Sequence, residues 1–201
     1  MEEARAILLR RYHFSEDSLV IVWLTDLHGK VKTSARRTTR PGSPFAGRLE
    51  LFTEAQITFK ITKKGDLHSL SEVEVFPAPA LPATYAILLS ASYFAELCDL
   101  FTETMYPVPE IFSLLHRAWG FLRTKEPTLR AVEHFEEELA GVLGIREPGV
   151  SGIQSLAAVA RKIPANRERL IKFLHSDPST GDTHATKARR NSDSTLRDHD
   201  Q

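Results

Sequence analysis

The pattern of apolar and polar positions changes period near residue 80. Before it, short apolar runs rich in β-branched and aromatic residues alternate with polar residues and end at turn signals, as β-strands do. The expected strands are 4–12, 17–26, 29–36, 48–62 and 67–76. Five short strands without a clear helix among them predict a small closed barrel, which also removes exposed strand edges. A five-stranded OB-fold is the first candidate and an SH3-like barrel is the alternative.

The alternation also predicts which side chains face the barrel interior. In 29–36 the small and apolar side chains alternate with polar and basic ones, so two faces are expected. The inward set is Val31, Thr33 and Ala35, and the outward set is Lys30, Lys32, Ser34 and Arg36. In the strand expected over 48–62 the inward candidates are Leu49, Leu51, Ile57, Phe59 and Ile61.

From Ala83 onward the apolar residues recur at helical spacing. Three prolines within 77–82 separate this part from the strands. Helices are expected to begin near residues 83, 108 and 127, followed by one or two shorter helices over 151–175. The apolar stripes of these four or five helices predict a compact bundle. After His175 one large aliphatic residue, Leu196, remains, so this tail is predicted to be disordered.

The predicted fold class is therefore α+β, in three parts. An OB-fold barrel over 1–80 is followed by an all-α helical domain over 81–175 and a disordered tail over 176–201. The N-terminus lacks the basic and apolar regions of a signal peptide, and the longest apolar stretch, 85–97, is interrupted by Glu96. A cytoplasmic protein without a membrane segment is expected.

Positive charge is concentrated in one short stretch of an otherwise neutral chain. The chain has 26 basic and 26 acidic residues, yet 27–49 contains six basic residues and no acidic one. These are Lys30, Lys32, Arg36, Arg37, Arg40 and Arg48. A row of cations on one strand and its loop predicts contacts with the phosphates of a nucleic acid, which carry no sequence information. The alternative is a solvated face that prevents edge pairing.

Aromatic residues for base stacking are scarce near this stretch. The strand that carries the lysines has none, and the nearby candidates are His13, His28 and Phe45. Phe45 is equally suited to plugging the barrel. The sequence therefore predicts contact with the backbone of a nucleic acid rather than with its bases.

Catalytic and metal-binding patterns are missing from the sequence. The single cysteine, Cys98, excludes a disulfide framework and a cysteine-rich zinc site, and the histidines are scattered. No Walker loop, GxSxG or HExxH sequence occurs. We therefore expect no enzyme, no catalytic residues, no cofactor and no metal.

Several stretches, in order, resemble one family. They are "RRYHFSEDSLVIVWLT", "HGKV", "SARRTTRP", "FAGRLELF" and "GDLHSLSEVEVF", followed by "YAILLSASYFAELCDLF", "PEIFSLLHRAW" and "FEEELAGVLGI". In this combination, over residues 3–145, the chain resembles the RecO family of bacterial recombination mediator and DNA repair proteins. Many members carry a four-cysteine zinc module, but 142–156 passes through that region without a cysteine, so zinc is not expected.

The resemblance implies an OB-fold joined to a helical domain, with a function in homologous recombination and DNA repair. It implies binding to single- and double-stranded DNA and annealing of complementary strands, in the cytoplasm at the nucleoid. It implies partnership with RecR and with the single-stranded-DNA-binding protein, and through them assistance in loading RecA. The DNA-contact role of the family's basic residues transfers to Lys30, Lys32, Arg36, Arg37 and Arg40, and less directly to Arg48.

Two other functions fit the same residues. An OB-fold that binds another protein would act as an interaction adaptor, and OB-folds also bind RNA. Salt dependence separates the first from nucleic-acid binding, because phosphate contacts weaken steeply with salt. Competition between DNA and RNA oligomers separates the second.

Overall fold

The computed structural model describes residues 1–176, which form five strands and five helices. The segment 177–201, almost all of the predicted disordered tail, lies outside the described residues. The elements are β1 (Glu2–Ser15), β2 (Ser18–Thr25), β3 (Gly29–Arg36), β4 (Glu54–Lys60), β5 (Leu67–Val75), α1 (Tyr85–Phe101), α2 (Pro109–Leu122), α3 (Leu129–Val142), α4 (Gly152–Val159) and α5 (Asn166–Ser176).

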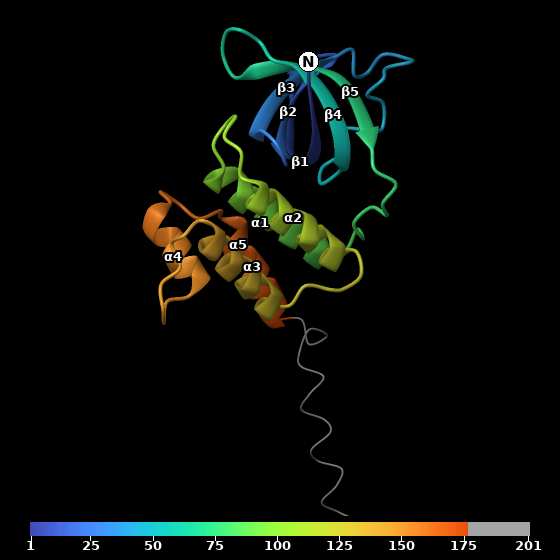
Figure 1. Cartoon of the computed structure of the whole chain (residues 1–201). Helices are drawn as coiled ribbons and strands as arrows, with labels where there is room; N and C mark the ends of the chain where they lie inside the picture. Colours follow the sequence, from blue (N-terminus) through green and yellow to red (C-terminus); the bar gives the residue numbers. More distant parts are fainter. Residues whose placement is uncertain (177–201) are drawn as a thin grey trace, which may run out of the picture.

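The strands close into a barrel in the order β1-β2-β3-β5-β4, with β4 pairing back onto β1 (Figure 1). All neighbours are antiparallel except β3 and β5, which are parallel. This is the topology of an OB-fold, so the predicted fold is confirmed. The barrel lies at one end of the molecule, with α1 and α2 directly beneath it.

The side chains of β3 alternate between the interior and the exterior of the barrel. Val31, Thr33 and Ala35 are buried, as predicted, and the side chains between them face outward. Trp23 is fully buried beside them, and its Nε1 donates a hydrogen bond to Thr33 Oγ1 at 2.9 Å. Phe45 enters the same core from the loop after β3, so it plugs the barrel.

The strand predicted over 48–62 is shorter than expected. Only Glu54–Lys60 is extended, and Leu51 and Ile61, predicted to face inward, are exposed. The chain turns at Phe52, whose φ of 67° is left-handed, and Phe52 N–H donates to Leu8 O at 3.0 Å. Backbone hydrogen bonds in this turn replace strand pairing. Of the residues before β4 in the predicted strand, only Leu49 packs into the barrel core.

The helices begin where local caps are available. Thr84 accepts a hydrogen bond from Ile87 N–H at the start of α1, and Thr128 accepts one from Ala131 N–H at the start of α3. Pro109 opens α2, where its missing N–H costs nothing. Four or five helices were predicted, and residues 1–176 contain five.

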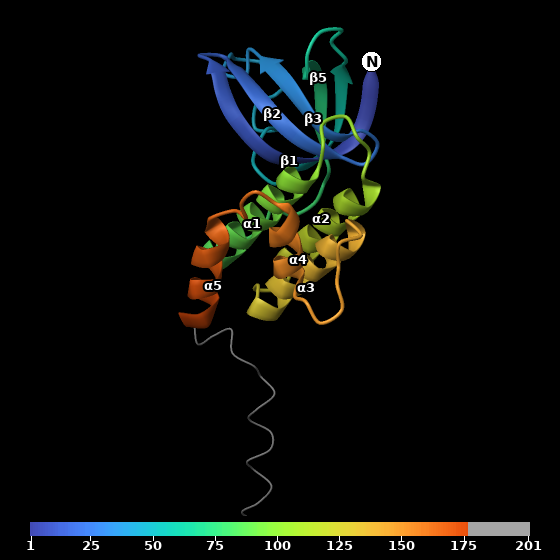
Figure 2. The same cartoon turned by 90° about the vertical axis from the view of Figure 1, so that its left-hand side faces the viewer.

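The outer side of the barrel shares a hydrophobic cluster with the helices. The barrel contributes Ile7 and Leu9 from β1 and Val22 and Leu24 from β2, which pack with buried residues of α1, α2 and α3. Figure 2 shows the barrel sitting on the first two helices, with α3, α4 and α5 farther away. The division into domains 1–80 and 81–175 stays a prediction, because the two parts share this cluster.

A backbone junction adds to this packing at the start of β3. Lys30 N–H donates to Glu103 O at 3.3 Å, and Met105 N–H donates to Lys30 O at 2.9 Å. Gly29 has a φ of 64°, and a Cβ there would lie 1.8 Å from Tyr106 O. Only glycine fits this approach. We call Gly29, Lys30, Asp99 and residues 102–106 the barrel–helix junction.

Candidate nucleic-acid interface

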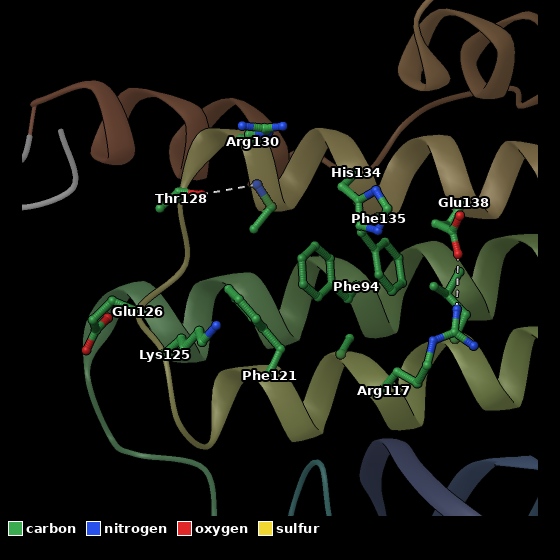
Figure 3. Close-up of a pocket in the computed structure, with 13 residues that line it drawn as sticks. Phe94, Arg117, Phe121, Lys125, Glu126, Thr128, Arg130, His134, Phe135 and Glu138 are labelled. Carbon is green, nitrogen blue, oxygen red and sulfur yellow. Dashed lines mark hydrogen bonds and ion pairs between the residues drawn. The ribbon is translucent and has the colours of Figure 1, made fainter. Parts of the chain in front are cut away.

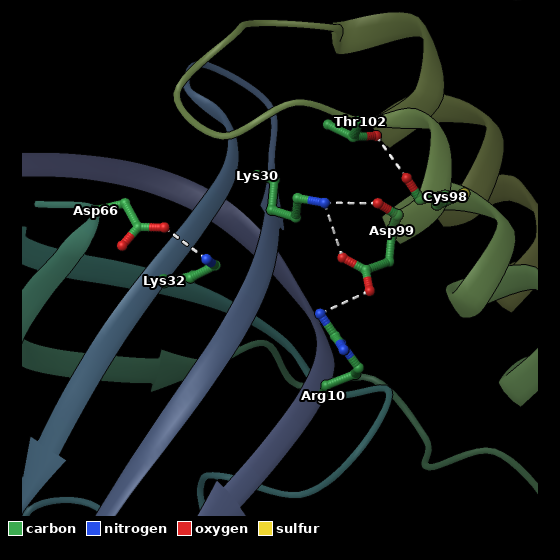
Figure 4. Close-up of polar contacts among 7 residues, drawn as sticks. All are labelled: Arg10, Lys30, Lys32, Asp66, Cys98, Asp99 and Thr102. Atoms are coloured by element: carbon green, nitrogen blue, oxygen red, sulfur yellow. Dashed lines mark hydrogen bonds and ion pairs between the residues drawn. The ribbon is translucent and has the colours of Figure 1, made fainter. Parts of the chain in front are cut away.

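Lys30 lies in the barrel–helix junction rather than on an open surface. Its Nζ donates to Asp99 O at 2.6 Å and forms an ion pair with Asp99 Oδ1 at 3.0 Å (Figure 4). The same carboxylate pairs with Arg10 of β1 at 2.9 Å. The Lys30 side chain is 16% exposed. Its charge is therefore matched by α1, and Lys30 is poorly placed to meet a phosphate.

Lys32, two residues along, has a partner on the surface. Its Nζ contacts Asp66 Oδ2 at 2.5 Å, in the turn before β5 (Figure 4). Hydrogen bonding and charge from Lys32 hold the pKa of Asp66 below its usual range, so the pair is ionised at neutral pH. Because this pair is exposed, it is weak, and an incoming phosphate can replace the carboxylate.

Arg36 and Arg37 carry uncompensated charge. Both are exposed at the end of β3, and neither side chain makes a hydrogen bond or ion pair within residues 1–176. Arg37 has a left-handed φ of 61°, an uncommon conformation for an arginine. Of the six predicted contact residues, these two are the most available to an anion.

Arg40 and Arg48 follow Arg36 and Arg37 in the loop after β3, but they differ in their partners. Arg40 Nε pairs with Asp17 at 2.9 Å in the turn between β1 and β2, close to the row in which Ser18 pairs with Arg36. Arg48 donates to the carbonyl of Val73 on β5 at 2.9 Å, so it keeps its charge but points to a different part of the barrel. Lys32, Arg36, Arg37 and Arg40 thus form one cluster, with Lys30 and Arg48 outside it.

Strand register reveals two aromatic residues that the sequence reasoning missed. Tyr12 of β1 pairs with Val20, and Val20 pairs with Ser34 of β3, so the three share one outward row. Tyr12 and Phe14 are exposed, by 48% and 70%. The two-residue turn at 16–17 would by itself pair Tyr12 with Ile21, but a register shift between His13 and Ser15 moves the pairing to Val20, so no local signal indicated it. We call this outer surface of β1, β2 and β3 the open face; it contains Arg10, Tyr12, Lys32, Ser34 and Arg36.

The other side of the barrel carries three exposed glutamates. Glu3 of β1 pairs with Thr58 of β4, which pairs with Glu72 of β5, and Glu74 follows on the same face. All three glutamates are exposed. Arg5 of β1 shares the row of Gln56 and Glu74, and Lys60 of β4 is also exposed, so charge on this side is mixed, and a polyanion is attracted to it less than to the open face.

Other titratable groups do not assemble into a reactive site. Burial raises the pKa of the Cys98 thiol, and desolvation lowers the pKa of His68 inside the barrel. Within residues 1–176 no three His, Cys, Asp or Glu side chains are placed to hold a metal ion. In the same range no helix has the length and apolarity to span a bilayer.

A groove of about 550 Å³ lies on the helices, away from the barrel, between α2 and α3 (Figure 3). Its floor is aromatic, with Phe94 stacked on Phe135 at 4.0 Å between ring centres, and Phe121 beside them. Cations stand at the rim. Arg117 pairs with Glu138 at 3.1 Å, whereas Arg130 is exposed and forms no ion pair within the described residues. The charged lining consists of Arg117, Lys125 and Arg130 with Glu126 and Glu138, so the groove suits an apolar ligand and has a small surplus of positive charge.

Comparison with known proteins shows one family. Residues 1–78 match the family model "Recombination protein O N terminal". Proteins named "DNA repair protein RecO" are similar over more of the chain. That of Actinobacillus pleuropneumoniae serotype 5b (strain L20) is 32% identical over 145 residues, 70% of this chain and 58% of the relative. That of Burkholderia pseudomallei (strain 1710b) is 30% identical over 179 residues, 89% of this chain and 60% of the relative.

The matches extend beyond the barrel into the helices, but the chain spans less than two thirds of the length of these relatives. A third relative, from Pelobacter propionicus, is 27% identical over 146 residues, 72% of this chain and 59% of its own length. These findings confirm the resemblance seen in the sequence. The chain is similar to the RecO proteins over most of its length, and its residues 1–78 match the model of the RecO N-terminal domain.

Proposed function

We propose that this protein acts in DNA repair and recombination by binding DNA phosphates with the open face and the adjoining loop of its barrel. The observation that carries the proposal is the pair Arg36 and Arg37, two exposed cations without partners in the described chain. Lys32 and Arg40 flank them in weak surface pairs. Together they form a local attraction for a polyanion in a neutral protein.

The same charge supports strand annealing. Two complementary strands repel each other until their phosphates are neutralised, and a cationic face lowers that repulsion. About four phosphate contacts predict a log–log salt slope of roughly −3 for single strands. On the ground of family likeness we also propose partnership with RecR and assistance in RecA loading. We propose no catalysed reaction.

The test is the double variant Arg36→Glu with Arg37→Glu. Binding of a single-stranded and a duplex oligonucleotide is measured by fluorescence anisotropy over a salt gradient. Losing two phosphate contacts and gaining repulsion predicts a loss of affinity of about tenfold or more for both probes. Unchanged affinity overturns the proposal.

A matched control is available in the helical part of the chain, with Arg161 between α4 and α5 and Arg169 in α5. Arg161 and Arg169 are exposed and form no ion pair within residues 1–176, so Arg161→Glu with Arg169→Glu changes net charge equally. This control is expected to retain most of the affinity. An equal loss in both double variants indicates non-specific attraction. If the barrel instead binds a protein with an affinity that does not depend on salt, the result favours the interaction adaptor. If RNA oligomers compete better than DNA oligomers, the result favours an RNA-binding protein.

A second proposal concerns the groove between α2 and α3. We propose it as the docking site for the acidic, apolar tail of the single-stranded-DNA-binding protein, because an aromatic floor lies beside Arg117, Lys125 and Arg130. A fluorescent peptide of that tail is expected to bind, and Arg130→Glu to weaken it severalfold, whereas Arg36→Glu leaves it unchanged. Equal binding to wild type and Arg130→Glu excludes the groove.

A further inference from the structure

Two large aromatic side chains lie exposed within three residues of each other at the end of β1. Tyr12 is 48% exposed and Phe14 is 70% exposed. A large aromatic ring that stays exposed to water does not contribute the stabilising free energy that its burial would give. Single exposed apolar residues are ordinary. Tyr12, however, lies on the basic open face by its pairing with Val20, and Phe14 follows it at the register shift between His13 and Ser15.

Register places Tyr12 between the cations of the open face. Its row, Tyr12–Val20–Ser34, lies between the row of Arg10, Val22 and Lys32 and the row that ends at Arg36. Rows on one face are about 7 Å apart and strands about 4.8 Å apart, so the Tyr12 Cα lies roughly 12 Å from those of Lys32 and Arg36. A nucleotide base on the ring therefore has its phosphates within reach of long cationic side chains.

The middle of the same row is apolar. Val20 is buried although it faces outward, and it pairs directly with Tyr12. Val20 is already covered, so the apolar surface open to a base is the exposed ring of Tyr12 itself. Every base has a π-face, so such stacking is tolerant of sequence.

We infer that Tyr12, assisted by Phe14, stacks on unpaired DNA bases, so that the protein binds single-stranded DNA more tightly than duplex. The inference rests on the proposed function and adds the kind of strand that the open face selects. In a duplex the faces of the bases are covered by their neighbours, and only phosphates meet the protein. Charge alone attracts both forms, whereas the ring favours unpaired bases.

The experiment compares Tyr12→Leu and Tyr12→Phe with wild type on a thymine oligomer, an abasic oligomer of equal length and a duplex. Loss of one stacked base predicts that Tyr12→Leu binds the thymine oligomer about 5- to 100-fold more weakly. Duplex affinity is expected to change less than twofold. Tyr12→Phe is expected to bind like wild type, and wild type is expected to bind the abasic oligomer about as weakly as Tyr12→Leu does.

A control and a direct signature accompany these affinities. Tyr106 is also an exposed tyrosine, at 62%, but it lies at the barrel–helix junction, so Tyr106→Leu is expected to leave binding unchanged. Tyr12→Trp places an indole at the site. Because Trp23 and Trp119 are fully buried, quenching on addition of the thymine oligomer reports on position 12.

The outcomes separate the two proposals. If Tyr12→Leu binds the thymine oligomer normally, or loses single-stranded and duplex binding equally, stacking is overturned while phosphate binding stands. Unquenched Tyr12→Trp in a complex that has formed also overturns it, and suggests that the rings meet a protein instead. If wild type binds no DNA, the proposed function fails and the stacking site fails with it.

Discussion

Lys30 and Arg36 lie six residues apart on β3, both facing outward, yet their surroundings differ. Lys30 is 16% exposed and held by Asp99, whereas Arg36 is exposed and meets no carboxylate within residues 1–176. The helices cover one end of the strand and leave the other open. A run of cations in a sequence therefore does not define one surface, because neighbouring elements decide which charges remain for a ligand.

The two ends of β3 also differ in what a substitution does. A poorly exposed cation depends on its partner, since removing the carboxylate leaves a charge with reduced access to water. Replacing an exposed arginine changes little in the folded structure, and such a surface substitution usually alters the free energy of unfolding by less than about 0.5 kcal/mol. We expect substitutions at the Lys30 end to change folding and substitutions at the Arg36 end to change binding.

The largest effect is expected at Gly29. Gly29→Ala adds a Cβ that would lie 1.8 Å from Tyr106 O, on a residue with a φ of 64°. The backbone at the barrel–helix junction must move apart, which predicts a loss of about 3 kcal/mol or more in the free energy of unfolding, measured with urea. Gly42→Ala is the matched control, because its φ is 75° and nothing lies within 4 Å. It is expected to cost about 1 kcal/mol; equal losses would show that the contact with Tyr106 is unimportant.

A smaller effect is expected at Asp99. Asp99→Ala leaves both Lys30 and Arg10 without their shared carboxylate. Breaking this partly buried arrangement predicts a loss of about 2 kcal/mol in unfolding free energy. DNA affinity is expected to hold or rise slightly, because Arg10 is half-exposed on the open face and gains free charge. A fall in affinity with unchanged stability would contradict the division of β3 into a structural end and a binding end.

The smallest effect is expected at Asp66, the partner of the intermediate Lys32. Asp66→Asn removes an exposed pair, so stability is expected to change by less than about 1 kcal/mol. Lys32 no longer has to leave Asp66 to meet a phosphate, so anisotropy titrations should show severalfold tighter DNA binding. The salt slope should stay near that of wild type, because Lys32 is one of the roughly four phosphate contacts already counted. Unchanged affinity would place Lys32 outside the DNA contact.

Local patterns were sufficient to predict most of the fold. The alternation from Lys30 to Arg36 identified the two faces of β3, and Thr84 and Thr128 lie where helices were expected to begin. The prediction failed near Phe52, where the segment keeps a strand-like composition but the chain turns in a left-handed conformation. This turn is supported by the hydrogen bond from Phe52 N–H to the carbonyl of Leu8, a residue that is distant in sequence.

The candidate site was less predictable for a similar reason. The partner of Lys30 is 69 residues away, and no local pattern indicates that Asp99 faces it. Tyr12 joins the basic residues only through two successive strand pairings. Residue type predicted which side chains suit phosphate, but tertiary packing determines which of them are accessible.

The aliphatic contact between the barrel and the helices has a consequence for assembly. An isolated barrel would expose to solvent the four side chains that pack on the helices, namely Ile7, Leu9, Val22 and Leu24. We therefore expect the barrel and the helices to unfold in a single thermal transition. A barrel expressed by itself should self-associate through that patch. If both proposed sites are occupied, the shared aliphatic contact fixes the separation between DNA on the barrel and a peptide in the groove on the helices.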